Sequence, residues 1–388
     1  MTVTLTSLRA YPLSARFADI YGGEDRIPPE IRRPAAHFQS IPRLGQYCTI
    51  VVCEASDGST GYGECFGLPT PTPAAEIVNR VAAPALVGRA LVTPSDMTAE
   101  LRRFFLALGN SKGPAMEAQS GIDIALWDLT ARRAQRSLAA ELGASPTDIP
   151  TYISPVPFLP TPEASARFAM TLAQGFNAVK LKVGRGAAQD IPHIAAVREA
   201  IGPGTELMLD ANCGYELIDA QLLVREIEQL DIRWLEEPLP PEDTRGARAL
   251  SDASSIAIAG GENEFTFEAI ERLIVDAGLT VVQPNISRAG GVSGLLRIDE
   301  IAGAHGARVS PHGVGGSVAV AATLHVAAAM RNFDLFEVNR LPNPLRDQLG
   351  VPSTYADGTA RPPAGDGHGV TVGAQMHRYL DPAATAAE

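Results

Sequence analysis

Three carboxylates recur at a fixed interval in the middle of the chain. Asp210 in MLDAN, Glu236 in WLEEP and Glu262 in AGGE are separated by 26 residues each. Each acid closes a short apolar run typical of a buried parallel strand, and the segments between the runs have helical periodicity. A strand with its crossover helix needs about 25 residues or more, so the spacing predicts three acids at the C-terminal ends of neighbouring parallel strands.

Three carboxylate oxygens at one edge of a sheet favour a hard divalent cation. Mg²⁺ is preferred over Mn²⁺ or Ca²⁺ for such an all-oxygen donor set. The alternative is three unrelated acids that face solvent at strand ends. The regular spacing favours the metal site.

Two lysines precede the acids. Lys180 and Lys182 lie in the apolar run VKLKV, and the alternation of a strand places both on one face. Lysine is rarely buried without a partner, and two like charges lower each other's pKa. A lysine with a lowered pKa is a candidate general base near neutral pH. The alternative is an exposed pair.

Other polar residues fall where further strands are expected to end. Asn212 follows Asp210 by two residues, and Asn285, His312 and Glu337 occur in QPN, VSPHG and LFEVN. Taken alone, His312 fits a structural histidine as well as a catalytic one.

The elements that must position these residues fall into two parts. Residues 2–10 alternate as a strand would, and residues 48–65 predict two strands joined by an Asp-Gly turn. Helical patterns follow near residues 74–88, 95–107 and 115–135. Strands followed by helices indicate an α+β domain over residues 1–135.

Residues 16–38 interrupt this domain with a long polar segment rich in Gly and Pro. Loops of this size inside compact domains are usually functional lids or disordered segments. We favour a mobile lid, in which Tyr21 and His37 could cover a ligand.

From Thr151 onward, strand-like runs alternate with helical stretches. The eight candidate strands are YISPVPF, AVKLKV, ELMLDA, IRWLEE, IAIAGG, TVVQPN, ARVSPH and LFEVN. This number matches a (β/α)₈-type barrel, whose chemistry sits at the C-terminal strand ends. A doubly wound open sheet would want a Gly-rich nucleotide turn after its first strand, and PVPFLPTP is not one. We assign the barrel to residues 136–345 and expect residues 346–388 to return to the first domain.

Composition excludes several classes of function. The 388 residues are 45% hydrophobic and 20% charged, with a net charge of −12 and no basic run, so nucleic acid is not expected as a partner. The four cysteines show no CxxC spacing, which predicts no disulfides and a cytoplasmic protein. No signal pattern occurs at the N-terminus, and the run VAVAATLHVAAAM is too short to span a membrane.

The motifs SGIDIALWDL, FNAVKLKVG, MLDAN, WLEEP, GGE and AGGVSG resemble the enolase superfamily, in its mandelate racemase-like subgroup, over nearly the whole chain. The resemblance implies a modified (β/α)₇β barrel with an N-terminal α+β capping domain and two mobile cap loops, residues 16–38 and the turn after Cys65. It also implies residue roles: Asp210, Glu236 and Glu262 as Mg²⁺ ligands, Lys182 and His312 as opposed acid/base groups, Lys180 and Asn212 as holders of the substrate carboxylate and its neighbouring hydroxyl, and Glu337 as a hydrogen-bond donor to that carboxylate.

One position departs from the pattern. Racemase-type members of the family usually pair the histidine with an Asp on the sixth strand, and this chain has Asn285 there. We expect Asn285 to accept a hydrogen bond from the imidazole without stabilising its charged form. His312 should then be a poor base, which leaves a one-base reaction with Lys182 as the base.

The resemblance implies Mg²⁺-dependent abstraction of the α-proton of a small carboxylate substrate to give an enediolate. Our leading hypothesis is β-elimination of water from a sugar acid, an acid-sugar dehydratase of carbohydrate acid catabolism. The alternatives are a cycloisomerase of a sugar-acid lactone, which the segment NRLPNPLRDQL resembles, and a racemase or epimerase. A non-catalytic binding protein is the third class. We also expect a homo-oligomer.

Overall fold

The structure, a computed structural model, describes residues 2–382 and begins with a three-stranded antiparallel sheet. Its strands are β1 (Leu5–Arg16), β2 (Gly45–Ala55) and β3 (Thr60–Phe66), paired in that order. The predicted Asp-Gly turn joins β2 and β3, and Gly58 has a φ of 86°. β1 is longer than residues 2–10 because it pairs with the whole of β2, as far as Arg16 opposite Gly45.

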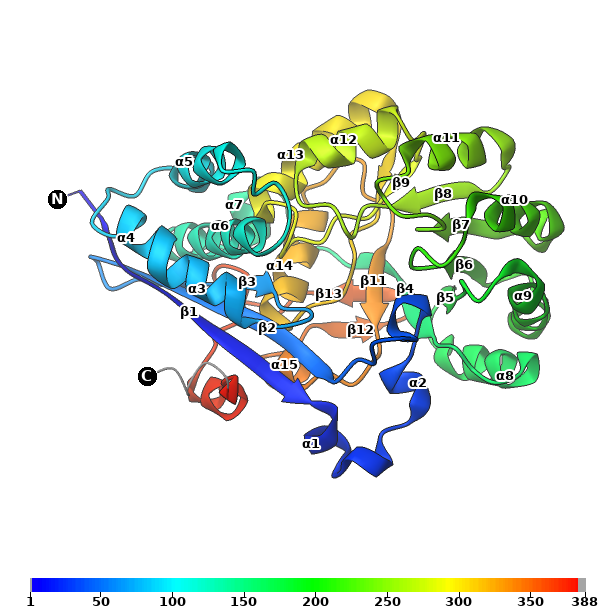
Figure 1. The fold of residues 1–388 in the computed structure, drawn as a ribbon. Helices are drawn as coiled ribbons and strands as arrows, with labels where there is room; N and C mark the ends of the chain where they lie inside the picture. Colours follow the sequence, from blue (N-terminus) through cyan, green and yellow to red (C-terminus); the bar gives the residue numbers. More distant parts are fainter. Residues whose placement is uncertain (1, 383–388) are drawn as a thin grey trace.

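Helices cover one side of this sheet (Figure 1). They are α3 (Thr72–Ile77), a π-helical turn (Val78–Ala82), α4 (Ala83–Leu86), α5 (Pro94–Ala107) and α6 (Pro114–Arg133). The three predicted helical stretches are therefore confirmed. The long helix α6 packs tightly on β3, since a Cβ atom at Gly63 would lie 1.9 Å from the Gly121 carbonyl oxygen.

Eight parallel strands form the second part of the molecule. They are β4 (Ile149–Val156), β5 (Ala178–Lys182), β6 (Glu206–Asp210), β7 (Ile232–Glu236), β8 (Ala257–Gly260), β9 (Val281–Val282), β10 (Arg308–Val309) and β11 (Phe336–Asn339). Strands β4 to β10 pair in chain order, and β11 pairs with β4. A parallel bridge between Val309 and Phe333 joins the two ends. The sheet is thus a closed barrel, and the open doubly wound alternative was wrong.

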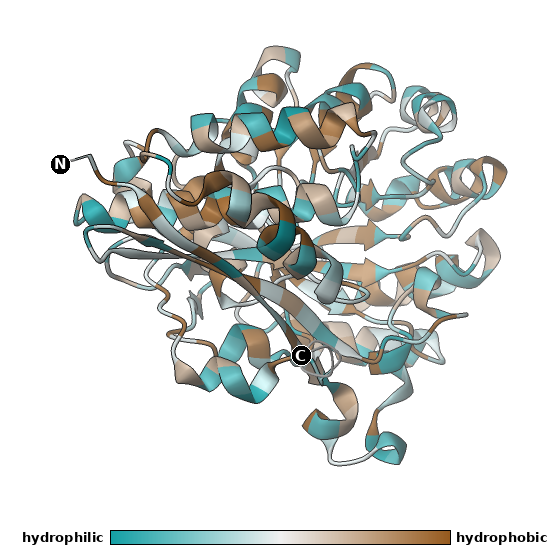
Figure 2. Ribbon diagram, turned by 60° about the vertical axis from the view of Figure 1, so that its left-hand side comes forward, coloured by the Kyte–Doolittle hydropathy of each residue, from teal (hydrophilic) through white to brown (hydrophobic). Residues whose placement is uncertain are grey.

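One helix follows each of the first seven barrel strands. These helices are α8 (Pro162–Leu172), α9 (Ala187–Ile201), α10 (Leu217–Glu226), α11 (Thr244–Ala253), α12 (Phe267–Val275), α13 (Gly291–His305) and α14 (Ser317–Ala327). After β11 come the short helix α15 (Pro344–Asp347) and, later in the described chain, a 3₁₀ turn (Ala374–Tyr379). Figure 2 shows hydrophobic colour along the barrel strands and hydrophilic colour on the outward faces of the helices. This arrangement is the predicted (β/α)₇β barrel.

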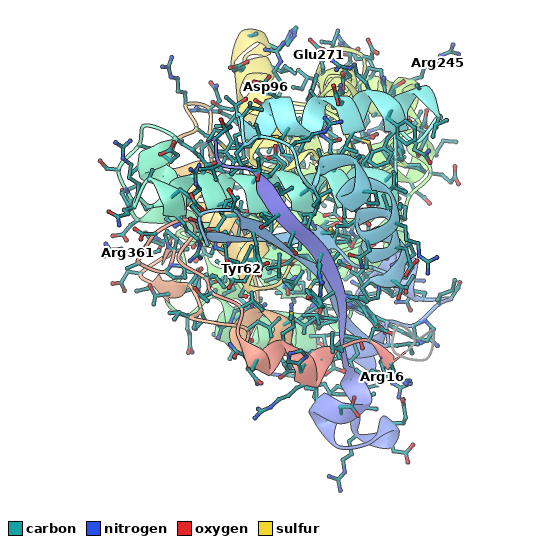
Figure 3. All side chains as sticks on the ribbon, turned by 90° about the vertical axis from the view of Figure 1, so that its left-hand side faces the viewer. Arg16, Tyr62, Asp96, Arg245, Glu271 and Arg361 are labelled. Atoms are coloured by element: carbon teal, nitrogen blue, oxygen red, sulfur yellow. The ribbon has the colours of Figure 1, made fainter. Side chains whose placement is uncertain are left out.

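The C-terminal segment runs back from the barrel to the first sheet. The hairpin of β12 (Thr354–Ala356) and β13 (Thr359–Arg361) pairs with the start of β4. The His368 side chain then contacts the Tyr62 carbonyl oxygen on β3 at 2.9 Å, and Leu380 forms a bridge with Leu13 on β1. Figure 3 shows the last helical turn, Ala374–Tyr379, beside β1 near Arg16.

The predicted lid loop is folded into short helical pieces. They are α1 (Phe17–Tyr21), a 3₁₀ turn (Glu24–Arg26), α2 (Pro29–Arg32) and a second 3₁₀ turn (Ala36–Phe38). Phe17, Ile27 and Ile31 pack with Leu341 in a small apolar cluster, which gives the lid its own core. Among the described residues, no helix is both long and apolar enough to cross a membrane.

Candidate active site

The ends of four adjacent barrel strands carry the three predicted acids and one lysine. Lys182 ends β5, Asp210 ends β6 and Glu236 ends β7, and the ladder pairs Lys182 with Asp210 and Asp210 with Glu236. Glu262 lies two residues beyond β8. There the chain turns at Gly261, whose φ of 116° is strained for any residue with a side chain. A Cβ atom at this position would also lie 2.8 Å from Ile270 Cδ1.

Asp210, Glu236 and Glu262 form one cluster. Each offers a carboxylate oxygen, and these oxygens all lie within 4.8 Å of one another. The Oε2 atom of Glu262 is buried and accepts no hydrogen bond from the described residues, although His312 Nε2 lies 3.3 Å away. With Glu337, four carboxyl groups surround the two lysines. Burial and the neighbouring charge of Asp210 raise the pKa of Glu236 well above its ordinary value, so a cation bound here would favour its ionised form. This all-oxygen donor set fits a hard divalent cation.

Lys180 is buried beneath this cluster. Its Nζ atom lies 2.8 Å from Glu236, 3.0 Å from Asp210 and 3.0 Å from Glu337. Burial by itself lowers the pKa of Lys180, but the three carboxylates outweigh it and the pKa is raised well above its ordinary value. The mutual lowering that we expected from the Lys180–Lys182 pair is therefore wrong for Lys180, because carboxylates and not Lys182 surround it.

Lys182 is partly exposed, whereas Lys180 is fully buried. The Lys182 side chain is 13% exposed, and Nζ donates hydrogen bonds to Asp210 Oδ2 and, at 2.7 Å, to Asn212 Oδ1. Asn212 lies two residues beyond the end of β6. It has a left-handed φ of 42°, and this turn brings its side chain back over the strand end towards Lys182.

The hydrogen bond between Asn285 and His312 runs opposite to our expectation. Asn285 Oδ1 accepts a hydrogen bond from Ser287 N at 2.9 Å, and its Nδ2 donates to the Val314 carbonyl at 2.8 Å. With the amide fixed in this way, Nδ2 also faces His312 Nδ1 at 3.0 Å. An amide nitrogen can only donate, so Nδ1 accepts and the ring proton lies on Nε2. Burial also lowers the pKa of His312, which favours the neutral ring.

Glu337 is an acceptor in this arrangement. It accepts a hydrogen bond from Gly313 N at 3.0 Å and pairs with Lys180. Burial raises its pKa, but the charge of Lys180 and other cations outweighs burial and lowers the pKa to about 2. The donor role that the resemblance implied would need a protonated Glu337, and these contacts stabilise the ionised form instead.

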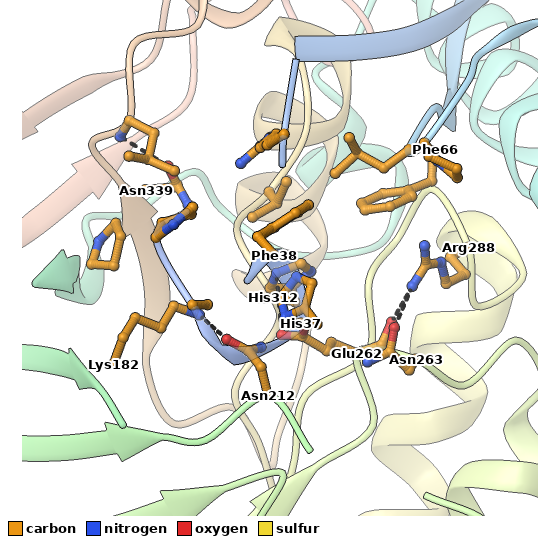
Figure 4. A pocket seen from close by; sticks show the side chains of 18 residues that line it. His37, Phe38, Phe66, Lys182, Asn212, Glu262, Asn263, Arg288, His312 and Asn339 are labelled. Atoms are coloured by element: carbon orange, nitrogen blue, oxygen red, sulfur yellow. Dashed lines mark hydrogen bonds and ion pairs between the residues drawn. The ribbon is translucent and has the colours of Figure 1, made fainter. Parts of the chain in front are cut away.

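A cavity of about 270 Å³ lies above the strand ends, between the barrel, the lid and the turn after Cys65 (Figure 4). His37 and Phe38 reach into it from the lid, towards Glu262 and His312. The residues lining it include Pro34, Ala35, His37, Phe38 and Arg43 from the lid region, Phe66, Leu68 and Pro69 from the cap, and Lys182, Asn212, Glu262, Asn263, Arg288 and His312 from the barrel.

Not every predicted site residue reaches this cavity. Tyr21 lies elsewhere in the lid and packs on Phe17, with ring centroids 6.5 Å apart. The buried residues Lys180, Asp210, Glu236, Asn285 and Glu337 do not line the cavity either. Two arginines in the wall, Arg43 and Arg288, were not among the predicted site residues. Arg288, three residues after Asn285, is recognisable as a polar residue near a strand end. Nothing in the sequence distinguishes Arg43 from the arginines of the preceding lid.

Both parts of the chain match models of one protein family. Residues 31–143 match the N-terminal domain of the mandelate racemase / muconate lactonizing enzyme family, and residues 163–376 match the enolase C-terminal domain-like family.

Relatives of known activity carry out more than one reaction. The chain is 31% identical over 337 residues to D-galactarolactone cycloisomerase of Agrobacterium fabrum, covering 83% of this chain and 88% of that protein. It is 38% identical over 220 residues to L-talarate/galactarate dehydratase of Salmonella typhimurium, covering 56% and 54%. A racemase from Streptomyces coelicolor A3(2), solved with bound magnesium, superimposes with a TM-score of 0.82 at 25% identity, covering 97% and 100%.

Proposed function

The chain belongs to the mandelate racemase / muconate lactonizing enzyme family of the enolase superfamily, and on that premise we propose that it is a Mg²⁺-dependent enzyme that eliminates a β-oxygen from a sugar acid. Lys182 removes the α-proton, an enediolate forms, and the C–O bond at the β-carbon breaks. In the leading reaction the β-hydroxyl takes a proton from the protonated Lys182 and leaves as water, and the enol product becomes a 2-keto acid.

The observation that carries this proposal is the position of Lys182 beside the carboxylate cluster and on the wall of the cavity. Asp210, Glu236 and Glu262 would hold Mg²⁺, which supplies positive charge to stabilise the enediolate oxygens. Asn212 holds the Lys182 ammonium group at 2.7 Å and so fixes its approach. Lys180 neutralises the charge of the buried acids and keeps them in place.

His312 supports elimination rather than racemisation. β10 lies nearly opposite β5 around the barrel, so His312 approaches from the side away from Lys182. Two-base racemisation needs an unprotonated nitrogen or a charged imidazolium on that side. Asn285 donates to Nδ1 and thereby favours a neutral ring with its proton on Nε2. Such a ring donates a hydrogen bond to a leaving oxygen but takes no proton at Nε2.

The second candidate is the cycloisomerisation of a sugar-acid lactone. The first half-reaction is the same, but the β-oxygen belongs to the lactone ring and leaves as a carboxylate, which needs no proton. A neutral His312 suits such a leaving group. The similarity to the Agrobacterium cycloisomerase covers more of the chain than the similarity to the dehydratase, which also favours this candidate.

Substrate turnover tests the proposal. A library of sugar acids and their lactones is incubated with the Mg²⁺-loaded enzyme, 2-keto acids are detected colorimetrically, and exchange of the α-hydrogen is followed by proton NMR in D₂O. A dehydratase releases 2-keto acid from an open-chain acid, and a cycloisomerase acts only on a lactone. Lys182→Ala should abolish exchange and product together. Full exchange in that variant would remove Lys182 as the base.

We also infer that the enzyme works as a homo-oligomer on a small carboxylate in the cytoplasm. The free state of all four cysteines, three of them buried, supports a reducing compartment. Light scattering during size-exclusion chromatography should give a multiple of the 40.9 kDa chain mass, and a mass of one chain would contradict the oligomer.

A further inference from the structure

A buried arginine without a carboxylate partner lies in the wall of the cavity. Arg43 is 7% exposed, and among the described residues no Asp or Glu forms an ion pair with its guanidinium. Its Nε donates to the Gly45 carbonyl at 3.3 Å, and Nη2 donates to Gln46 Oε1 at 2.5 Å. Nη1 forms no hydrogen bond to the described residues. A buried charge without a counterion is costly, so this arrangement needs an explanation.

The surroundings of Arg43 keep it in place and keep it charged. Its guanidinium carbon lies 6.0 Å from the centroid of the Phe17 ring and 5.8 Å from that of Phe38. Gln46 connects this region to the barrel through a hydrogen bond of 2.8 Å from Nε2 to the Pro342 carbonyl. Burial lowers the pKa of Arg43 to about 10, which still leaves the side chain positive at neutral pH.

The second arginine of the cavity, Arg288, has a carboxylate partner within the protein. Arg288 lies 3.4 Å from Glu117 Oε1 and donates at 3.0 Å to both the Glu262 carbonyl and Asn263 Oδ1. Its charge is therefore matched within the protein. Arg43 has only neutral acceptors, and it lines the cavity.

Arg43 and the reaction centre lie on two sides of one small space. Lys182 and the acid cluster belong to the barrel, whereas Arg43 belongs to the segment between the lid and β2. His37 lies in the field of both, since desolvation, Lys182 and Arg43 all lower its pKa. A ligand whose reacting carboxylate lies at the acid cluster would thus present its far end to the lid side of the cavity.

We propose that Arg43 binds a second carboxylate at the far end of the substrate, so that the enzyme acts on a sugar dicarboxylate (an aldarate, or its monolactone) rather than on a monocarboxylate. The proposal rests on the elimination proposed above and names its substrate class. A guanidinium binds a carboxylate through charge-assisted hydrogen bonds, and the buried position strengthens them. A primary alcohol at the same place would leave the buried charge unmatched.

Matched pairs of substrates test this directly. Each six-carbon aldarate is compared with the aldonate of the same configuration, in which a CH₂OH group replaces the far carboxylate, and each lactone with its monocarboxylate counterpart. We expect wild-type kcat/KM to favour the dicarboxylate. Arg43→Met, which keeps much of the side-chain volume, should lower kcat/KM for the dicarboxylate by about 10- to 100-fold, from about 1.5–3 kcal/mol for a hydrogen bond to a charged group, and change the monocarboxylate by less than about threefold.

Two further variants separate binding from folding. Arg33→Met removes an arginine of the lid, which donates to the Phe38 and Gln39 carbonyls and does not line the cavity. This variant should leave the dicarboxylate preference unchanged. Arg43→Lys keeps the charge and should restore part of the preference. If Arg43→Met lowered kcat/KM equally for both members of a pair, Arg43 would be structural and the proposal would be overturned.

A binding measurement separates this inference from the proposed reaction. Calorimetry of the Mg²⁺-loaded protein with galactarate and with galactonate, repeated over the other configurations, reports affinity without turnover. Arg43-dependent binding of dicarboxylates without any α-hydrogen exchange would support the inference while contradicting the elimination. Turnover with equal preference for both acids in the wild type would contradict the inference and leave the elimination standing.

Discussion

One amide side chain decides which nitrogen of His312 carries the proton. Asn285→Asp would replace the donor that faces Nδ1 by an acceptor, so the ring would carry its proton on Nδ1 and expose a lone pair at Nε2. The nearby negative charge would also raise the pKa of His312. We predict that this variant gains α-hydrogen exchange on the face opposite Lys182, measured by proton NMR in D₂O with each epimer of a substrate.

The matched control is Asn285→Leu, which removes the donor and supplies no acceptor and should gain no such exchange. A folded Asn285→Asp protein that exchanges only on the Lys182 face would contradict the assigned direction of the hydrogen bond. The proximity of the Val314 carbonyl, which now accepts from Asn285, should cost the Asp variant some stability.

The three acids of the cluster differ in whether they form an ion pair with a lysine. Asp210 and Glu236 both pair with buried Lys180, whereas no described lysine pairs with Glu262. Glu262→Gln should therefore abolish Mg²⁺ binding with little change in the melting temperature measured in EDTA. Asp210→Asn and Glu236→Gln should also lose Mg²⁺ but lower that melting temperature, because removal of one partner of a buried ion pair costs about 3–5 kcal/mol.

Calorimetry with MgCl₂ and thermal melts in EDTA give both quantities for each variant. Unchanged Mg²⁺ affinity in any one variant would exclude that residue from the site. Equal melting temperatures for all three variants would contradict the role of Lys180 as the buried counterion.

At the scale of elements, the lid is held to the barrel by a few contacts. The Phe158 amide donates to the Pro34 carbonyl at 3.2 Å. The lid backbone otherwise forms short helical turns with local hydrogen bonds. Local opening with a small free energy is expected of such a segment. We predict that a bound substrate or inhibitor slows tryptic cleavage after Arg26 and Arg32, followed by mass spectrometry.

Cleavage after Arg136, an exposed residue in the turn after α6, is the internal control and should not change. Equal protection at both places would indicate stabilisation of the whole fold, and no protection at the lid would contradict ordering over the ligand. Exchange of residues 16–38 for a relative's lid should change which substrate is used.

The contact between the cap and helix α14 depends on one buried acid. Glu64 on β3 accepts hydrogen bonds from Gly316 N and Ala319 N at the start of α14, yet burial outweighs them and raises its pKa to about 7. Because the folded pKa is raised above the unfolded value, the stabilising effect is full below about pH 4 and is lost as the pH rises through about 7.

Wild type should therefore lose stability relative to Glu64→Gln between about pH 4 and 8, by about 3 kcal/mol at most. Urea unfolding at a series of pH values measures the difference, and Glu76→Gln, on an exposed ion pair, is the control. A difference between wild type and Glu64→Gln that does not vary with pH would show that Glu64 does not titrate in this range.

At the scale of the whole molecule, the metal site joins the ends of three barrel strands that are far apart in the sequence. A ligand that binds only the folded state stabilises the entire fold, by about 2.7 kcal/mol at 100 times its dissociation constant. We predict that MgCl₂ raises the melting temperature, that EDTA reverses the effect, and that NaCl of equal ionic strength does not reproduce it. A rise that NaCl matched would indicate screening of the net charge of −12 instead of a specific site.

The sequence by itself determined the barrel, the cap and the metal cluster, because their signals are local or periodic. A strand and its crossover helix occupy a nearly constant length of chain. The 26-residue spacing of Asp210, Glu236 and Glu262 therefore predicted that the three side chains lie close together, as they do. The motifs around Lys182 and the three acids, with SGIDIALWDL and AGGVSG, carried the resemblance to the family. The helices near residues 74–88, 95–107 and 115–135 followed from their periodicity.

Only the tertiary structure decided how the side chains pair. Whether Asn285 donates or accepts depends on the Ser287 amide and the Val314 carbonyl, which fix its amide group. The pKa of Lys180 depends on three acids from three other strands. Arg43 is a candidate binding residue because no described carboxylate forms an ion pair with it. Only the folded structure shows which side chains surround it. Hydrogen-bond direction, counterions and burial arise from contacts between distant segments, and no local pattern in the sequence encodes them.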